Sequence, residues 1–392
     1  MPIYFDNNAT TPVNQEVVDA MIPFLRNHYG NPSSAYSIGV ESNKAITEAR
    51  QQLANLLNMS PSGIIFTSSG SESDNMAIKS VARHYKGIKN TIISTSIEHH
   101  AVLHSLETLK ESGFNIIHLN PNEKGQVEVN DLIKILNSEI GKDVFLVSVM
   151  AANNETGVCQ PINEIGKILK DKNIVFHVDC VQSIGSKGKP KYGDLISISG
   201  HKVNAPKGIG ALCISDNFEN KFGFSLSPFI DGGKQEMGLR GGTENVPYIV
   251  GYAKAMTIFR NNADKYNSHT SMLRNHLKEF IKKNINDVKF NTQENIDTLS
   301  NTLNVSFKGI DGAALLMYLN EFDICISTGS ACNTGSPKPS HVLKAMGLTD
   351  EEAFSSIRIS FGLQNTFEEL EYFEEILIKG IIHLRRISGY KN

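Results

Sequence analysis

The sequence contains no tryptophan, no cysteine pair with metal-ligand or redox spacing, and no marked excess of either charge. Its five cysteines are odd in number and scattered, which argues against a disulfide framework and a structural zinc site, so we expect no metal. A formal net charge of −3 gives no overall field to attract nucleic acid. The chain start lacks the basic and apolar regions of a leader, and no apolar run is long enough to span a membrane. We therefore expect a cytoplasmic protein that binds neither a membrane nor nucleic acid directly.

The composition of the 392 residues is typical of a globular protein, with 40% hydrophobic and 20% charged residues. Between about residues 60 and 215, short β-branched runs alternate with amphipathic helical stretches; the runs read IIFTS, TIIST, FNIIHL, VFLVSV, IVFHVD, LISIS and ALCIS. Runs that are apolar on both faces predict parallel strands covered by helices on each side. We expect an α/β fold in which residues 16–260 form a large, cofactor-binding domain with a mostly parallel sheet between helices.

The pattern changes after residue 260 to a long polar helix, strand-like runs near LNVSF, DICIS and SSIRISF, and a closing helix from Phe367. Residues 261–392 therefore predict a smaller α+β domain. Residues 1–15 offer caps and turns rather than strands. We expect this N-terminal segment to pack with the small domain.

Lys202 follows the run LISIS and precedes the glycine-rich NAPKGIGA. Ligands of open α/β sheets collect at the carboxyl ends of strands, and a lysine there is well placed to form a Schiff base with a cofactor aldehyde. Asp179 ends the run IVFHVD and can pair with the pyridinium nitrogen of pyridoxal 5'-phosphate, with Gln182 one turn further into the next helix. The plain alternatives are a solvated lysine and an aspartate that caps a helix.

Gly70 and Ser71 stand where the run IIFTS meets the start of a helix. Backbone N–H groups and a hydroxyl at such a position suit the cofactor phosphate. A plain capping arrangement from Ser71 to Asp74 is an equal alternative. Ser199 and His201, on either side of the lysine turn, could close on the same phosphate.

Two further strand ends supply ring contacts. His99 could stack on the cofactor ring and shuttle protons, although a lone histidine is more often structural, with His100 as the structural candidate. Asn154 could hydrogen-bond the phenolic oxygen of the cofactor and the substrate carboxylate, but such turns are also common without any function.

Cys332 stands in the small and polar stretch STGSACNTGSPKPSHVL, whereas the other four cysteines lie in or beside apolar runs, where a thiol is usually a small buried hydrophobe. That composition predicts an exposed, mobile loop suited to a thiol that enters a pocket and leaves with cargo. Arg358 lies inside the run SSIRISF, where a guanidinium needs a partner, and a bidentate clamp on an amino acid carboxylate would supply one.

Taken in order along the chain, these motifs resemble the cysteine desulfurases of the NifS/IscS type, in the class V aminotransferase group of fold-type-I pyridoxal phosphate enzymes. The resemblance runs from end to end and is carried by YFDNNATTP, HYGNPSS, FTSSGSESDN, EHHAV, NNETG, HVDCVQS, SGHK, PKGIG, RGGTENV, TGSAC and SSIRISFG. One departure is Ser71, where many relatives have threonine. The hydroxyl is kept, so we expect little change.

The resemblance implies a role for each of these residues. It implies that Lys202 carries the cofactor, that His99 stacks on its ring, that Asp179 and Gln182 hold the ring, that Ser71, Ser199 and His201 bind phosphate, that Asn154 and Arg358 hold the substrate carboxylate, and that Cys332 receives the sulfur. In relatives the RGGTENV loop crosses the two-fold axis of a homodimer, so Thr243 should reach the phosphate of the other subunit. The bland alternative is that Thr243 caps a helix near Glu244.

The implied reaction removes sulfur from L-cysteine, releases L-alanine and leaves a persulfide on Cys332. A selenocysteine lyase or another class V transaminase is the alternative in the same fold, and the cysteine in a long loop argues against both. A non-catalytic scaffold would lack Lys202, Asp179 or Arg358, and none is missing. The sulfur acceptor stays open among an iron–sulfur scaffold, tRNA or DNA thiolation and cofactor synthesis.

Overall fold

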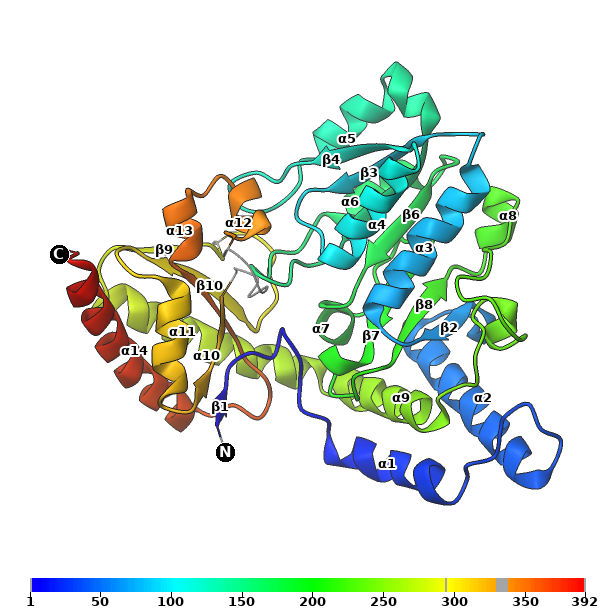
Figure 1. The fold of residues 1–392 in the computed structure, drawn as a ribbon, viewed down its shortest axis with the longest axis horizontal. Helices are drawn as coiled ribbons and strands as arrows, with labels where there is room; N and C mark the ends of the chain where they lie inside the picture. Colours follow the sequence, from blue (N-terminus) through cyan, green and yellow to red (C-terminus); the bar gives the residue numbers. More distant parts are fainter. Residues whose placement is uncertain (1, 293–294, 329–337, 391–392) are drawn as a thin grey trace.

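The computed structural model describes residues 2–292, 295–328 and 338–390, arranged as two lobes (Figure 1). The larger lobe runs from α1 to α9, and the smaller contains the later elements with the first strand. Helix α10 (Ala263–Asn284) packs on α7 of the larger lobe and on α14 of the smaller. Among the described residues, we find no helix that combines the length and the apolar character needed to cross a membrane.

The large lobe is built on a seven-stranded sheet with the order β2-β8-β7-β6-β5-β3-β4. Its strands are β2 (Ile64–Thr67), β3 (Thr91–Thr95), β4 (Asn115–Leu119), β5 (Val144–Met150), β6 (Val175–Asp179), β7 (Leu195–Ser199) and β8 (Gly210–Ile214). Strand β8 is antiparallel to both of its neighbours and the other pairs are parallel. The mostly parallel sheet between helices confirms the predicted α/β fold, and every predicted run of this region is a strand.

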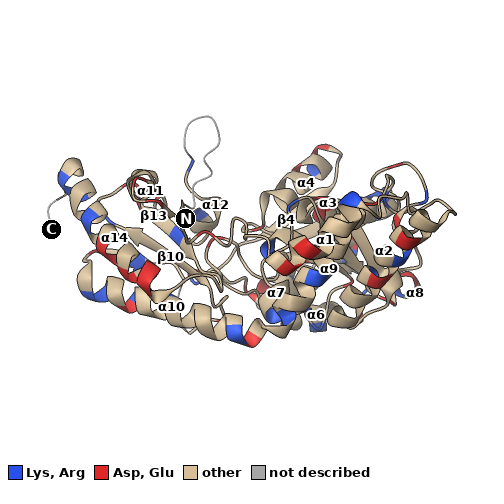
Figure 2. Ribbon diagram, turned by 90° about the horizontal axis from the view of Figure 1, so that it is seen from below, with Lys and Arg blue, Asp and Glu red and all other residues tan. Residues whose placement is uncertain are grey.

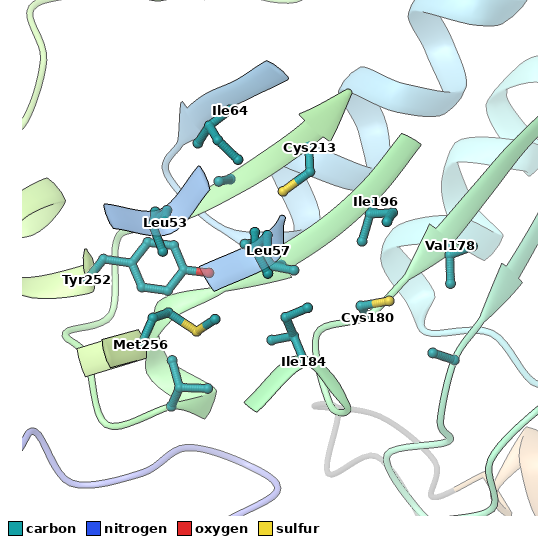
Figure 3. Packing of buried hydrophobic residues seen from close by; sticks show 14 of the residues in the cluster. Leu53, Leu57, Ile64, Val178, Cys180, Ile184, Ile196, Cys213, Tyr252 and Met256 are labelled. Atoms are coloured by element: carbon teal, nitrogen blue, oxygen red, sulfur yellow. The ribbon is translucent and has the colours of Figure 1, made fainter. Parts of the chain in front are cut away.

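Helices cover both faces of this sheet. They are α1 (Gln15–Arg26), α2 (Ser37–Leu57), α3 (Gly70–Tyr85), α4 (His100–Glu111), α5 (Val129–Leu136), α6 (Ile162–Leu169), α7 (Ile184–Lys187), α8 (Phe218–Phe222) and α9 (Val246–Asn261). Figure 3 shows one core layer, in which Leu53 and Leu57 of α2 and Tyr252 of α9 meet side chains of the sheet. Leu53 is fully buried, and burial of one such apolar side chain contributes about 1.5–3 kcal/mol.

The small lobe has a four-stranded antiparallel sheet with the order β12-β13-β10-β9. The strands are β9 (Val288–Phe290), β10 (Thr302–Phe307), β12 (Ser327–Thr328) and β13 (Ser356–Ser360), and the remaining helices are α11 (Gly312–Asn320), α12 (His341–Ala345), α13 (Asp350–Phe354) and α14 (Phe367–Ser388). A capping box of Thr366 and Glu369 begins α14 at the predicted place. Figure 2 shows acidic and basic residues interspersed on its outer helices, as the small net charge predicts.

The N-terminal segment holds a short strand that its sequence did not indicate. Strand β1 (Ile3–Tyr4) pairs in parallel with β11 (Ile324–Cys325) of the small lobe. Phe5 is fully buried there, with its ring edge-on to Phe361 and Phe373 at centroid distances of 5.3 and 5.5 Å. This packing fixes the backbone of the next residues, which border the cleft between the lobes.

Candidate active site

A cleft of about 430 Å³ opens at the carboxyl ends of the central strands. It brings together ten of the twelve predicted site residues: Gly70, Ser71, His99, Asn154, Asp179, Gln182, Ser199, His201, Lys202 and Arg358. The strand register explains part of this assembly, because Asp179 pairs with Met150 of β5 and with Ser197 of β7 at one edge of the sheet. Residues far apart in the sequence therefore share one wall of the cleft.

Lys202 ends a single 3₁₀ turn, Gly200–Lys202, directly after β7. Its Nζ donates hydrogen bonds to the backbone oxygens of Asn8 and Ala9, the latter at 2.9 Å. Desolvation, followed by the positive charge of Arg358, lowers the pKa of Lys202 to about 7. A substantial fraction of this amine is therefore free of its proton near neutral pH, as a nucleophile requires.

Asp179 is the last residue of β6 and is almost fully buried. Its Oδ1 accepts a hydrogen bond of 2.8 Å from the backbone N–H of Val181. The helix-cap alternative is wrong, because α7 begins only at Ile184, and Gln182 for the same reason lies in a turn and not in a helix. Burial raises the pKa of Asp179 to about 6, while the bond from Val181 and the charge of Lys202 lower it, so this carboxyl is mostly ionised at neutral pH.

The start of α3 forms the turn at which the sequence predicts phosphate binding. Ser69, and not Ser71, caps the helix by accepting the N–H of Glu72 at 3.1 Å, so the capping alternative for Ser71 is wrong. Ser199 is 1% exposed, and its Oγ has no hydrogen-bond partner among the described residues. A Cβ on Gly70 would come within 2.6 Å of Val181 and 3.3 Å of Ser199, so only a bare backbone fits this corner.

Two histidines at this edge are neutral at physiological pH. Desolvation, followed by the positive charge of Lys202, lowers the pKa of His99 and of His201 to about 4 each. His99 is the N-cap of α4, where its Nδ1 accepts the N–H of Ala101 at 3.1 Å. His201 pairs through Nδ1 with the hydroxyl of Thr10 at 3.2 Å. Both rings are therefore uncharged and add no positive charge to the cleft.

Arg358 lies on β13 and is 7% exposed, and the partner that its position requires is Asp6. Its Nη2 donates to Oδ1 of Asp6 at 2.7 Å, and its Nη1 donates to the backbone oxygen of Asn154 at 3.0 Å. The Nε atom has no partner among the described residues. The guanidinium is thus oriented by the N-terminal segment and keeps one donor available.

Several polar residues of the cleft were missed in the sequence. Asn8 lines it and accepts through its backbone oxygen from Lys202 and, at 3.1 Å, from Gln182. Asp6 and Asn8 belong to the quoted motif YFDNNATTP, so the motif carried the signal although its acidic and amide residues were given no role. Only the fold shows that Asn8 borders the cleft and that Asp6 contacts Arg358 there, because the N-terminal segment reaches the cleft through tertiary packing.

Two buried carboxyls lie behind Asp179. Asp74, which borders the cleft, is 1% exposed, and burial together with the negative charge of Asp179 raises its pKa well above its usual range. Burial raises the pKa of Glu98 to about 8. The neighbouring His177 bonds through its ring to Ser148 at 2.8 Å and Ser197 at 3.0 Å, and burial lowers its pKa to about 3. At neutral pH the negative charge at this strand end therefore resides mainly on Asp179.

The other two predicted site residues are Cys332 and Thr243. Cys332 lies outside the described residues. Thr243 is exposed and does not line the cleft of its own chain. The capping alternative for Thr243 is wrong, because Asn245 caps α9 and accepts the N–H of Tyr248 at 3.4 Å. Of the remaining thiols, Cys159, Cys180 and Cys213 are buried as expected, whereas Cys325 is half-buried.

Comparisons with known proteins agree with the family that the sequence motifs indicated. The chain matches the family described as aminotransferase class-V over residues 3–373. It is 43% identical over 390 residues to the cysteine desulfurase IscS of Clostridium botulinum, covering 98% of this chain and 96% of that protein. A solved structure of a NifS-like protein superposes with a TM-score of 0.89 at 40% identity, covering 98% of this chain and all of that one. A structure titled SspA in complex with cysteine gives 0.80 at 35% identity, covering 93% and 100%.

Proposed function

Because the chain belongs to the class V aminotransferase family and, within it, to the cysteine desulfurases, we propose that its cleft binds pyridoxal 5'-phosphate and L-cysteine and that Cys332 receives the sulfur. In the overall reaction the carbon–sulfur bond of L-cysteine breaks and a sulfur–sulfur bond forms, giving L-alanine and a Cys332 persulfide. The observation that carries the proposal is the cleft itself, which combines a poised lysine, a buried carboxylate and an anion-binding turn.

The residues present fit the cofactor. The buried, unpartnered hydroxyl of Ser199 and the bare backbone at Gly70 suit a phosphate, with Ser71 and His201 beside them. Asp179 would hold the ring nitrogen, Gln182 and His99 would contact the ring, and Lys202 would hold the aldehyde carbon. When bound, this cofactor supplies an electron sink for the substrate carbon atoms.

The charges of the cleft support distinct proton roles. Lys202, with a pKa of about 7, can take a proton from the substrate α-carbon and return it at the neighbouring carbon. His99 is neutral and its Nδ1 accepts the N–H of Ala101, so its Nε2 carries the proton and can donate it in a hydrogen bond to the cofactor or the substrate. Asp179 stays ionised because the N–H of Val181 and the charge of Lys202 oppose the effect of its burial, and its charge in turn helps the two carboxyls behind it to keep their protons. The negative charge of Asp179 is therefore available to a cationic ring.

Arg358 and Asn154 would hold the substrate carboxylate. A carboxylate on Arg358 would be a charge-assisted hydrogen bond, and the existing bond to Asp6 orients the fork before the substrate arrives. This arrangement distinguishes an α-amino acid from an amine that lacks the carboxylate. It therefore supports an amino acid substrate rather than a simple thiol.

The chain on both sides of Cys332 is anchored beside the cleft. Ser327 pairs with Arg358 across the small sheet, and Ser340 donates its hydroxyl to Glu155, next to Asn154. Cys332 is five residues beyond Ser327 in the sequence, and an extended chain spans at most about 3.3–3.6 Å per residue. Such a length of chain would allow the Cys332 thiol to reach a substrate held by Arg358.

The experiment that tests the proposal separates cofactor chemistry from sulfur acceptance. Cys332→Ser should still bind pyridoxal phosphate and should change its absorbance when L-cysteine is added, but it should release no L-alanine. Cys325→Ser, seven residues earlier, is the matched control and should turn over normally. Alanine formation by Cys332→Ser at the wild-type rate would refute the assignment of the acceptor.

A homodimer with shared sites is the second part of the proposal. Large apolar side chains are exposed on α1, α2 and the turn between them: Ile22, Leu25, Tyr29, Tyr36 and Val40. Such a surface favours association, and Thr243 is free to reach the site of a second copy. Mixing Lys202→Ala with Thr243→Ala subunits would give one intact site in each heterodimer, so part of the activity should return.

Failure to recover activity, despite proven subunit exchange and a defective Thr243→Ala parent, would exclude shared sites.

The persulfide acceptor is proposed only as a protein. The sequence leaves its identity open among scaffold proteins and thiolation enzymes. Transfer of labelled sulfur from L-cysteine to candidate proteins would identify it.

A further inference from the structure

Glu72 brings a negative charge into the first turn of α3, the turn proposed to bind the phosphate. Its side chain is 8% exposed. Its Oε2 accepts the backbone N–H of Ser68 at 2.8 Å and the Ser68 hydroxyl. A carboxylate here suits the helix dipole, but it also opposes the binding of a phosphate within the same turn.

Arg240 meets this charge from the segment that carries Thr243. Its Nε donates to Oε1 of Glu72 at 2.9 Å, and its Nη2 lies 3.4 Å from Oε2. Desolvation opposes the charged form of Glu72, but the bonds from Arg240 and Ser68 outweigh it and leave the pKa of Glu72 below its ordinary value. Glu72 is therefore ionised, and Arg240 is the cation that compensates it.

We propose that Arg240 is a positioning residue for the cofactor: by neutralising Glu72 and holding its carboxylate toward Ser68, it leaves the start of α3 open to a phosphate. This inference rests on the proposed function and goes beyond it, because it gives a role to an arginine that does not line the cleft. The same bond joins the anion-binding turn to the segment of Thr243.

A second ion pair holds the same segment and serves as a matched control. Glu236 accepts two bonds of 2.7 Å from Arg50 and one of 2.8 Å from the N–H of Phe66. Its carboxylate is buried like that of Glu72, but Arg50 and Glu236 do not line the cleft, and neither stands in the first turn of α3. Breaking the Arg50–Glu236 pair therefore tests the anchoring of the segment that carries Thr243 without changing the charge at the first turn of α3.

The test compares pyridoxal phosphate with pyridoxal, which lacks the phosphate, by titration of the cofactor-free full-length chain. Arg240→Met should weaken pyridoxal phosphate binding about tenfold, the size expected for one uncompensated charge within a helical turn, and should leave pyridoxal binding unchanged. Glu72→Gln combined with Arg240→Met should return the affinity for pyridoxal phosphate to within about twofold of the wild type. Arg50→Met should lower the melting temperature and leave the ratio of the two affinities unchanged.

The outcomes separate the two proposals. A wild-type chain that binds pyridoxal phosphate no better than pyridoxal would overturn the proposed function together with this inference. Equal losses for both ligands in Arg240→Met, or no recovery in the double variant, would overturn the inference alone. Should Arg240→Met fail to fold, Glu72→Gln decides the matter, since the inference requires it to bind pyridoxal phosphate at least as tightly as the wild type.

Discussion

The two walls of the cleft are held in different ways. On the large-lobe wall, three side chains bond to backbone only two or three residues away: Asp179 to Val181, His99 to Ala101 and Ser69 to Glu72. On the small-lobe wall, Arg358 is oriented by Asp6 and Asn154, which are 352 and 204 residues away. The proposed cofactor wall is therefore built largely from local turns, although Lys202 and His201 also bond to the N-terminal segment. The proposed substrate wall depends entirely on how the lobes and this segment come together.

Removal of Lys202 should have the largest effect, because no other lysine lines the described part of the cleft. Lys202→Ala should lower alanine formation by at least about 10³-fold and abolish the absorbance of the lysine-bound cofactor. Turnover and absorbance spectra measure both effects. Lys207→Ala, five residues later in the glycine-rich stretch, is the matched control and should keep both. Full activity in Lys202→Ala would end the assignment of the cofactor lysine.

Loss of Arg358 should damage the other wall and leave the first intact. We expect Arg358→Ala to lower kcat/KM for L-cysteine by about 10²-fold, the order of one buried charged contact, while the affinity for pyridoxal phosphate stays within about twofold. Arg358→Lys keeps the charge without the planar fork and should recover only part of the loss. A parallel loss of cofactor affinity would show that the two walls are not separable.

Asp6→Asn asks how far the substrate wall depends on the N-terminal segment. The change keeps an acceptor for Arg358 but removes the charge, so we expect KM for L-cysteine to rise about tenfold with kcat changed by less than about threefold. Asp19→Asn, on α1, is the control outside the cleft. If kcat falls instead of KM rising, Asp6 acts on the chemical step and not on substrate positioning.

The last prediction concerns stability, and no effect on the reaction, at the proposed cofactor wall. Glu98 in the folded state has a pKa of about 8, raised above its ordinary value by burial, so between about pH 4.5 and 8 the folded chain holds a proton that the unfolded chain has lost. Stability from this group is complete below that window and falls as pH rises, by at most about 1.4 kcal/mol per pH unit.

Glu98→Gln keeps an acceptor for Thr95 and for the N–H of Met150, so it should remove this pH dependence without disturbing the wall. Its free energy of unfolding relative to the wild type should therefore rise from pH 5 to pH 8. Denaturant unfolding at both pH values measures the difference. The exposed Glu111→Gln is the control, and the prediction is wrong if both variants follow the wild-type pH dependence.

The sequence predicted the features that depend on neighbouring residues. Alternating runs gave the strands, their order gave the α/β fold, and the ordered motifs gave the resemblance to cysteine desulfurases that the comparisons confirm, with the lyase and transaminase alternatives not favoured. Ten of the twelve predicted site residues meet in one cleft. Nine of them do so because strand ends in the large sheet share an edge, and Arg358 reaches the cleft from the sheet of the small lobe. The roles assigned to them remain proposals.

The N-cap residues of the helices were harder to predict, since more than one nearby hydroxyl or amide side chain could cap each helix. The structure placed the caps at Ser69 and Asn245 and moved Gln182 out of the helix. Only the tertiary structure could pair Arg358 with Asp6, bring Arg240 to Glu72, and bury Asp74 and Glu98 behind Asp179. The physical reason is that the partner and the protonation of a buried charge depend on which distant segments exclude water from it, whereas strands and turns follow from patterns within a few residues.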